Sequence, residues 1–254
     1  MTDLSRQPLA GKVALVTGSA RRIGRQTALA LAREGAHVIT HARSSRHDIE
    51  AVADEIRSTG GKATALLADL TDEDAVQQLV HDIHTAAGPV SILINNAAIR
   101  GESPFLDLDL ETFRSVYSVA VEGAFLVTQA VVPDMIAAHF GRVITLGGVS
   151  AHVGVCERLH VATAKAALVG FTKALAVEFA TEGVTANLVV PGAIGGQRSA
   201  NSGTGGKLAG GRHPLVGHEG EPQDVAELVR FLALPGGGYI TGQTLHVSGG
   251  LYLP

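Results

Sequence analysis

The sequence has little cysteine, little charge and no long hydrophobic run. Cys156 is the only cysteine in 254 residues, which excludes a disulfide within the chain and suits a reducing compartment. The formal net charge of −4 gives no reason to expect a nucleic acid as a partner. No uninterrupted apolar run is long enough to span a bilayer, and the first residues, MTDLSRQPLAGK, lack the apolar core of a signal peptide. We therefore expect a soluble, cytoplasmic protein that contacts neither nucleic acid nor membrane.

Metal-ligating residue types do not gather in the sequence. His81 and His84 have i,i+3 spacing on a predicted helix, but no further ligand residues stand near them. We interpret this pair as part of a solvated helix face and expect no metal site.

Apolar residues are abundant and form a regular pattern. They make up 46% of the chain, which predicts a compact globular protein with a sizeable core. Short β-rich runs, apolar on both faces, alternate with longer helical patterns, which predicts βαβ units and an α/β fold with a parallel sheet. No linker divides the chain, so we expect a single domain over residues 1–254. The seven predicted strands are 12–17, 36–40, 63–68, 91–95, 141–147, 184–190 and 243–248.

One glycine-rich segment stands apart, GAIGGQRSANSGTGGKLAGGRHPLVGHEGEP at 192–222. It holds few apolar anchors, so a loose surface connection is one interpretation. Long irregular loops in compact domains are usually functional or disordered. We predict that this segment forms a lid over a substrate site.

The run TGSARRIG at 17–24 joins the first predicted strand to the first long helix. Small residues at such a junction let the backbone approach a phosphate, and the helix N-terminus supplies amide donors and a favourable dipole. Two glycines alone are weak evidence, but their place between strand and helix near the start of a βαβ chain makes it stronger. We predict that Gly18, Ser19, Ile23 and Gly24 line a nucleotide phosphate site.

Six segments in succession carry a family resemblance over nearly the whole chain. They are TGSARRIG, NNAA (95–98), HVATAK (160–165), PGAI (191–194), EPQDVA (221–226) and YITGQTLHVSGG (239–250). In this order they resemble the signatures of the short-chain dehydrogenase/reductase family. The resemblance implies a seven-stranded, doubly wound Rossmann-type sheet, a nicotinamide dinucleotide cofactor and often a homotetramer.

Two places in the sequence favour NADP(H) over NAD(H). The middle glycine of the family's turn is Arg22 here, preceded by Arg21, and in this the chain resembles the pteridine reductases. NAD-dependent members carry an acid after the second strand, where this chain has Ala42 followed by Arg43 and Ser44. A carboxylate there would repel a 2′-phosphate, whereas guanidinium groups pair with one. Either arginine alone could be a solvated surface charge, but two near the ribose without the acid favour NADP(H).

The resemblance also assigns the remaining cofactor contacts by position. They lie at the adenine edge, beside the adenosine ribose and along the nicotinamide. One customary contact is absent, because the threonine often found after the nicotinamide stretch is Gly196. The matching residues are Asp69 and Leu70 at the adenine edge, Asn96 and Ala97 beside the ribose, and Pro191, Gly192 and Ile194 along the nicotinamide.

Most of the family's catalytic residues are missing. Catalysis usually depends on a tyrosine that gives or takes the proton, a serine that holds the substrate oxygen, a lysine that binds the nicotinamide ribose and an asparagine that anchors a water. By position, the asparagine, serine and tyrosine are replaced by Ala120, Gly148 and Val161. Lys165 is the one member of this set that the chain retains.

Other side chains could deliver the proton. His160 precedes the tyrosine position, but one residue turns a helical side chain by ~100°, so it reaches the site only if the helix begins there. The alternative for His160 is a cap or surface position. Tyr117 stands one turn before Ala120 on the same helix face, with core packing as its alternative. Ser150, two residues past the serine position, could supply a displaced hydroxyl or be an ordinary turn residue.

Three functional hypotheses fit these residues. The first is an NADP(H)-dependent reductase with altered proton delivery, because a general acid contributes ~10²–10⁴-fold and conjugated or imine-like substrates need it less than a simple carbonyl does. The second is a non-catalytic, regulatory protein that binds NADP(H), and the third is a lyase or isomerase that keeps the nucleotide as structure. The turn, the arginines and Lys165 favour the first, with Val161 expected to leave an apolar surface beside the reactive carbon.

Two predicted helices, near 109–138 and 160–181, are apolar on more than one face. A helix that is apolar on most sides must be buried in its own core or against another subunit. The family resemblance implies a four-helix contact between subunits. We therefore expect a homotetramer, or a homodimer.

Overall fold

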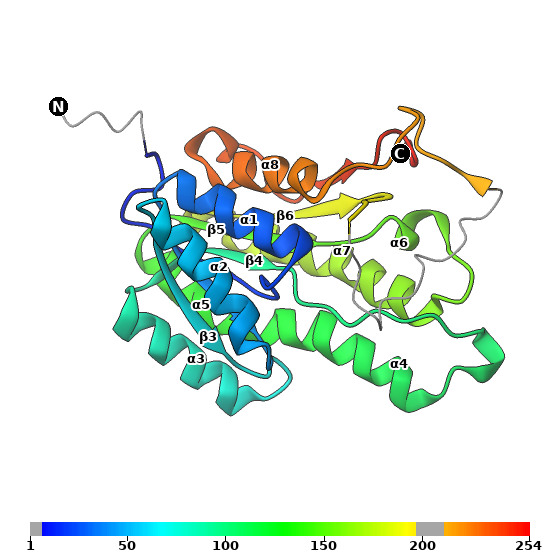
Figure 1. Cartoon of the computed structure of the whole chain (residues 1–254), viewed down its shortest axis with the longest axis horizontal. Helices are drawn as coiled ribbons and strands as arrows, with labels where there is room; N and C mark the ends of the chain where they lie inside the picture. Colours follow the sequence, from blue (N-terminus) through cyan, green and yellow to red (C-terminus); the bar gives the residue numbers. More distant parts are fainter. Residues whose placement is uncertain (1–6, 197–210) are drawn as a thin grey trace.

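Seven parallel strands form one sheet at the centre of the molecule (Figure 1). The structure is a computed structural model that describes residues 7–196 and 211–254. The strand order β3-β2-β1-β4-β5-β6-β7 confirms the predicted doubly wound, Rossmann-type α/β fold. All seven predicted strands are present, with ends shifted by no more than two residues. They are β1 (Val13–Val16), β2 (His37–Ala42), β3 (Lys62–Leu67), β4 (Val90–Asn95), β5 (Gly141–Leu146), β6 (Val184–Pro191) and β7 (Thr244–Val247).

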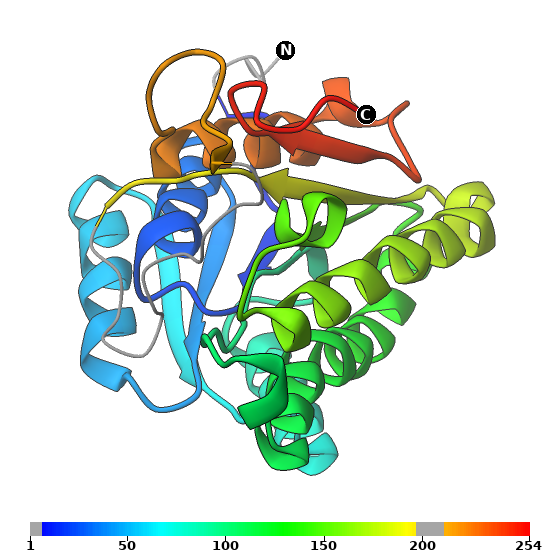
Figure 2. The ribbon, with the colours of Figure 1, turned by 90° about the vertical axis from the view of Figure 1, so that its right-hand side faces the viewer.

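Helices lie on both sides of the sheet, as Figure 2 shows from the edge. The α-helices are α1 (Arg22–Arg33), α2 (Arg46–Ser58), α3 (Glu73–Ala86), α4 (Leu110–Tyr117), α5 (Gly123–Ala137), α6 (Ser150–Val153), α7 (Leu159–Phe179) and α8 (Pro222–Ala233). The shorter elements are the 3-10 turns η1 (Phe105–Asp107), η3 (Ala180–Glu182) and η6 (Pro235–Gly237), and the π-turn η2 (Ser118–Glu122).

The core consists mainly of two apolar layers, one on each face of the sheet. Helices α1, α2 and α8 cover one face, with residues such as Leu31 and Ile49 fully buried. Helices α3, α5 and α7 cover the other, around residues such as Ile83 and Met135. Each fully buried side chain of this size stabilises the fold by roughly 1.5–3 kcal/mol. Because both faces are covered, the strands are apolar on both sides, as the sequence pattern indicates.

The strand order reverses beside β1, and this reversal positions the site. The chain runs outward from β1 through β2 to β3, then crosses back to β4 on the other side of β1. Near their carboxyl ends the two strands pair at Val16 and Ile94. The loops that follow them lead away in opposite directions, which creates a crevice where ligands bind in open α/β sheets.

The predicted helix near 109–138 is a continuous helical stretch, Leu110–Ala137, interrupted in hydrogen-bond pattern by the π-turn η2. Among the described residues it is the one helix that is long and apolar enough to cross a membrane by length and composition. Its second half packs on the sheet, where Val127, Val131 and Met135 are fully buried. This packing is that of a core helix in a folded domain.

The predicted lid at 192–222 is described only at its two ends, and residues 197–210 lie outside the described ranges. The ends are joined by backbone hydrogen bonds from Gly195 N to Gly220 O (2.8 Å) and from Gly220 N to Ala193 O (3.0 Å). Helix α8 then begins with a capping box between Glu221 and Asp224. The two ends of the segment therefore lie side by side and are joined by hydrogen bonds. Its action as a lid stays a prediction.

Candidate functional site

Close packing explains the small residues of the nucleotide turn after β1. Gly18 has a φ of +63°, in the left-handed region that favours glycine. A Cβ on Gly24 would stand 2.4 Å from the carbonyl oxygen of Gly18, so no larger residue fits where α1 meets the turn. Ser19 is fully buried, and its backbone N–H donates to the carbonyl of His41 at 2.9 Å. These small residues and hydrogen bonds fix the backbone of the turn, and no large side chain covers it.

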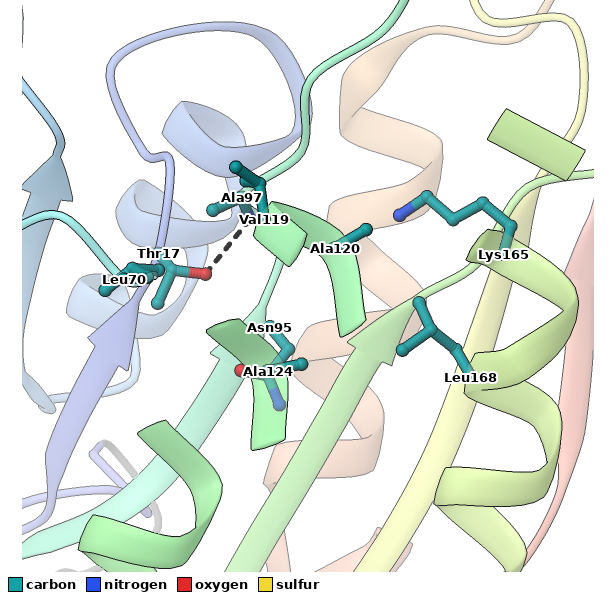
Figure 3. Close-up of a pocket in the computed structure, with 9 residues that line it drawn as sticks. All are labelled: Thr17, Leu70, Asn95, Ala97, Val119, Ala120, Ala124, Lys165 and Leu168. Atoms are coloured by element: carbon teal, nitrogen blue, oxygen red, sulfur yellow. Dashed lines mark hydrogen bonds between the residues drawn. The ribbon is translucent and has the colours of Figure 1, made fainter. Parts of the chain in front are cut away.

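Asn96 locks this turn from the neighbouring strand. Its side-chain amide donates to the carbonyls of Thr17 and Gly18, both at 2.9 Å. The hydroxyl of Thr17 accepts from the backbone N–H of Asn96 at 2.9 Å and of Ala97 at 3.0 Å, the second of which Figure 3 shows. The structure thus places Asn96 and Ala97 at the crevice, and it shows that the Asn96 amide supports the turn itself.

His41 is a residue of this site that the sequence reasoning missed. Its Nδ1 accepts from the backbone N–H of Gly18 at 3.4 Å, and its Nε2 lies 3.1 Å from the carbonyl of Ala68, so the Nε2 carries the proton. Burial lowers the pKa of His41 to about 4, which keeps the ring neutral. A histidine at the end of a buried strand, beside a phosphate turn, is the signal that could have identified it.

The end of β2 carries the residues assigned to the adenosine ribose. The side chain of Arg43 is 65% exposed, and its guanidinium lies 4.0 Å from the carboxylate of Asp69. Hydrogen bonds from Thr71 hold the pKa of Asp69 below its ordinary value, so this carboxylate stays charged. Ser44 is exposed beside Arg43, while Leu70 is buried in the core. An exposed cation therefore stands directly after Ala42, the position at which the family resemblance implied an acid in NAD-dependent members.

Both arginines of the turn bond to groups of the protein itself, and the prediction that Arg22 faces the 2′-phosphate together with Arg43 stays a prediction. Arg22 donates to the carbonyl of Gly196 at 2.7 Å and to that of Ile194 at 3.0 Å. Its φ of +52° is in the left-handed region, as suits a position where the family has glycine. Arg21 forms an ion pair of 3.0 Å with Asp48 on α2. A long arginine side chain turns towards the hydrogen-bond acceptors within its reach. For Arg22 these acceptors lie across the crevice.

The stretch assigned to the nicotinamide is a rigid backbone segment after β6. The carbonyl of Pro191 accepts from the N–H of Val149 at 3.1 Å, and the N–H of Gly192 donates to Val247 O at 2.9 Å. A Cβ on Gly192 would stand 2.7 Å from the Cα of Ser248, which explains the glycine. Ile194 is buried at the base of the 192–222 segment.

Lys165 on α7 points into a small pocket at the crevice (Figure 3). Its side chain is buried, and the Nζ donates to the carbonyl of Leu146, at the end of β5, at 2.5 Å. Burial, and secondarily the charge of Arg100, lowers the pKa of Lys165 to about 7. The pocket has room for about one water molecule. Its lining residues are Thr17, Leu70, Asn95, Ala97, Val119, Ala120, Ala124, Lys165 and Leu168.

The positions of the missing asparagine and tyrosine form a packed apolar cluster. Val161 and Ala120 are buried together with Val116 and Ala164, and Tyr117 packs on this cluster from its edge. Only 6% of the surface of Val161 is exposed, because short side chains let α7 pack closely against α4 and the π-turn. Its place beside the reactive carbon stays a prediction.

Two of the three alternative proton donors, His160 and Tyr117, do not line the pocket of Lys165. His160 is 1% exposed, and neither ring nitrogen has a hydrogen-bond partner within the described ranges. Its Nε2 would lie 3.5 Å from a Cβ on Gly101, so the loop after β4 covers the ring. Burial lowers the pKa of His160, which disfavours its charged form. Neither His160 nor Tyr117 is among the residues that line the pocket.

Known proteins resemble this chain over almost its full length. The family profile described as Enoyl-(Acyl carrier protein) reductase matches residues 18–252. A 3-oxoacyl-[acyl-carrier-protein] reductase from Synechocystis sp. is 38% identical over 246 residues, which cover 96% of this chain and 98% of the relative. These matches span the nucleotide turn, Lys165 and the C-terminal strand.

Two solved structures share the fold closely. A blue fluorescent protein from a metagenomic library, in complex with NADPH, has 35% sequence identity and a TM-score of 0.87, and the match covers 97% of this chain and 100% of that one. A short-chain type dehydrogenase/reductase from Mycobacterium marinum has 33% identity and a TM-score of 0.88, with 100% of both chains covered. With its sheet order and its nucleotide turn, this chain belongs to the short-chain dehydrogenase/reductase family.

Proposed function

We propose that this protein is an NADP(H)-dependent oxidoreductase with atypical proton delivery. One observation carries the proposal: a nucleotide turn fixed by Asn96 and His41 lies beside a buried Lys165, while the proton-transfer positions are apolar. The turn and Lys165 suit a bound dinucleotide, whereas the apolar positions remove only the proton transfer of the usual reaction. The solved structure with NADPH, at 35% identity over nearly the whole chain, supports the choice of cofactor.

The residues of the crevice fit such a cofactor. The turn from Gly18 to Gly24 has no room for larger side chains, and its backbone leads into the N-terminus of α1. Arg43, with Ser44 beside it, would hold the 2′-phosphate, and the stretch Pro191–Ile194 would bound the nicotinamide. Lys165 would bind the nicotinamide ribose. When bound, NADPH supplies a hydride to the substrate.

The chemistry that suits this pocket requires little acid catalysis. A positioned general acid contributes ~10²–10⁴-fold, so its loss penalises a simple ketone most. A conjugated, imine-like or otherwise activated carbonyl compound can accept the hydride first and take a proton from solvent later. Lys165 can exchange a proton near neutral pH, because its pKa is lowered to about 7. Because the asparagine and tyrosine positions are apolar, a flat, largely apolar substrate suits the site beside this pocket.

Cofactor selectivity is tested by fluorescence titration with NADPH and NADH. We expect much tighter binding of NADPH, and Arg43→Asp should weaken NADPH in particular by ~1–3 kcal/mol, because a charge-assisted pair with the 2′-phosphate is lost. Arg114→Asp makes the same charge change at an exposed position on α4 and serves as the control. Equal affinities for the two nucleotides in the unmodified protein contradict the assignment.

Activity is tested by following NADPH oxidation with a panel of imines, pterins, quinones and enones. We expect turnover in at least one class, reduced in Lys165→Ala, and negligible oxidation of secondary alcohols with NADP⁺ because Val161 cannot take the hydroxyl proton. Turnover that Lys165→Ala leaves unchanged would show that the lysine is not part of the machinery. Ready oxidation of alcohols would make His160 and Tyr117 the first residues to substitute.

The apolar cluster around Val161 and Ala120 favours a second candidate, a protein that binds NADP(H) without catalysis. The same panel separates the two. Tight NADPH binding without turnover in any class supports the binding protein, and conversion of a substrate without NADPH oxidation supports a lyase or isomerase instead.

We also propose a homotetramer, or a homodimer, in the cytoplasm, with small-molecule substrates and without nucleic acid or membrane contacts. Helices α5 and α7 support the assembly, because they are apolar on most sides and expose Phe125 and Val177. The glycine-rich segment 192–222 would close over the substrate.

A further inference from the structure

Gly148 leaves an open space beside Lys165. This residue follows β5, at the position where the family carries its serine. A Cβ on Gly148 would meet only two atoms within 4 Å, the Oγ of Ser150 at 3.6 Å and the Cγ of Lys165 at 3.7 Å. The space that a serine side chain would fill is therefore free, and a hydroxyl from another residue borders it.

Ser150 is held at this place by the backbone of α6. The N–H of Ala151 donates to the carbonyl of Gly148 at 3.1 Å, and the N–H of Gly154 donates to that of Ser150 at the same distance. The residue is partly exposed, and its hydroxyl makes no hydrogen bond within the described ranges. Its backbone is fixed, and its hydroxyl is a donor that the described part of the fold does not use.

We propose that Ser150 binds the substrate oxygen in place of the missing serine, and that the substrate is therefore an activated carbonyl compound, such as a β-keto ester or a conjugated enone, and not an iminium. The proposal rests on the proposed reductase function. As hydride reaches the carbon, the electron pair of the double bond moves to the oxygen, where the Ser150 hydroxyl stabilises the negative charge until solvent water supplies the proton. An iminium nitrogen has no lone pair to accept this hydrogen bond, so Ser150 would have no task with it.

The test compares Ser150→Ala, Ser150→Thr and the double variant Gly148→Ser/Ser150→Ala with the unmodified protein. With 2-cyclohexen-1-one or ethyl acetoacetate and NADPH, we expect Ser150→Ala to lower kcat by ~10²-fold without changing the Kd of NADPH, because one oxyanion donor is lost. Ser150→Thr keeps the hydroxyl, and the double variant places one in the free space, so both should recover most of the rate. Ser58→Ala, at the far end of α2, is the matched control.

A cyclic iminium salt is reduced equally by Ser150→Ala and the unmodified protein if the proposal holds. Unchanged enone and ketone rates in Ser150→Ala, or an iminium rate that falls with them, overturn it. Binding of ethyl acetoacetate to the NADP⁺ complex, measured by NMR, gives a readout without turnover, and we expect Ser150→Ala to weaken it about 3- to 10-fold. If the unmodified protein reduces nothing, the proposed function fails, yet the binding comparison still decides the role of Ser150.

Discussion

Two buried polar residues, His41 and Lys165, determine what the crevice can do. His41 stays neutral and joins the N–H of Gly18 to the carbonyl of Ala68, so it fixes the nucleotide turn against the third strand. Lys165 donates to the carbonyl of Leu146 and has no carboxylate or tyrosine in its pocket. An amine in apolar surroundings without an acidic partner loses its proton at a lower pH than an exposed lysine does. For Lys165 the neutral amine is therefore populated near pH 7.

The buried amine of Lys165 predicts a pH dependence of stability. Its folded pKa, about 7, lies below the ordinary value of 10.5, so between these pH values the unfolded chain binds more protons at this residue. Stability therefore rises with pH across this window and is lost as pH falls towards 7. Lys165→Met removes the group, and the difference in unfolding free energy between Lys165→Met and the unmodified protein should change by a few kcal/mol from pH 7 to pH 10.

Thermal or urea denaturation at pH 7, 8.5 and 10 measures this difference. Lys173→Met, an exposed lysine on the same helix, is the control and should follow the unmodified protein. Parallel pH curves for Lys165→Met and the unmodified protein would mean that Lys165 is solvated or paired when folded.

At the scale of elements, the contact between α7 and the helical stretch α4–η2–α5 decides the character of the site. The π-turn η2 lies opposite Lys165 and brings Ala120 to the pocket (Figure 3). Such turns are frequent at functional sites, because they break the regular helix pattern locally. Here the turn is present although the asparagine is not, so the helix geometry is independent of that side chain.

This contact predicts that the tyrosine cannot simply be restored. Val161→Tyr inserts a ring into the cluster of Val116, Ala120 and Ala164, and overpacking of this kind costs ~1–3 kcal/mol. Gly148→Ser enters open space and should cost less than ~1 kcal/mol. Urea denaturation of the two variants measures the difference. Equal stabilities would show that the cluster has room for the ring.

At the scale of the whole molecule, the exposed apolar residues of α5 and α7 predict self-association. Val177 is 85% exposed, although α7 is a largely apolar helix that packs on the sheet. Static light scattering at micromolar concentration should give the mass of a tetramer or dimer, and Val177→Glu should shift it towards the monomer, because a charge would be buried at the contact. Gln77→Glu adds the same charge at an exposed position on α3 and should have no effect. A monomer in the unmodified protein rules the assembly out.

The sequence by itself determined the seven strands and their parallel arrangement, and it predicted the nucleotide turn at 17–24 and apolar or small residues at three positions where the resemblance implies catalytic ones. These features depend on local patterns, such as apolar runs of strand length, glycines at a strand–helix junction and residue types at matched positions, and such patterns are visible without coordinates. The helices near 109–138 and 160–181 were also predicted within two residues of their ends, because their apolar pattern is long and unbroken.

Only the tertiary structure decided where individual side chains point. Arg22 was expected beside Arg43, but it bonds carbonyl groups more than 170 residues away in sequence, at Ile194 and Gly196. Likewise, the burial of Val161 and the closeness of Ser150 to the space at Gly148 arise where separate elements pack together. A side chain adopts the rotamer that reaches an available acceptor or fills an available space, and distant parts of the chain create both. A pattern in neighbouring residues therefore cannot specify the rotamer.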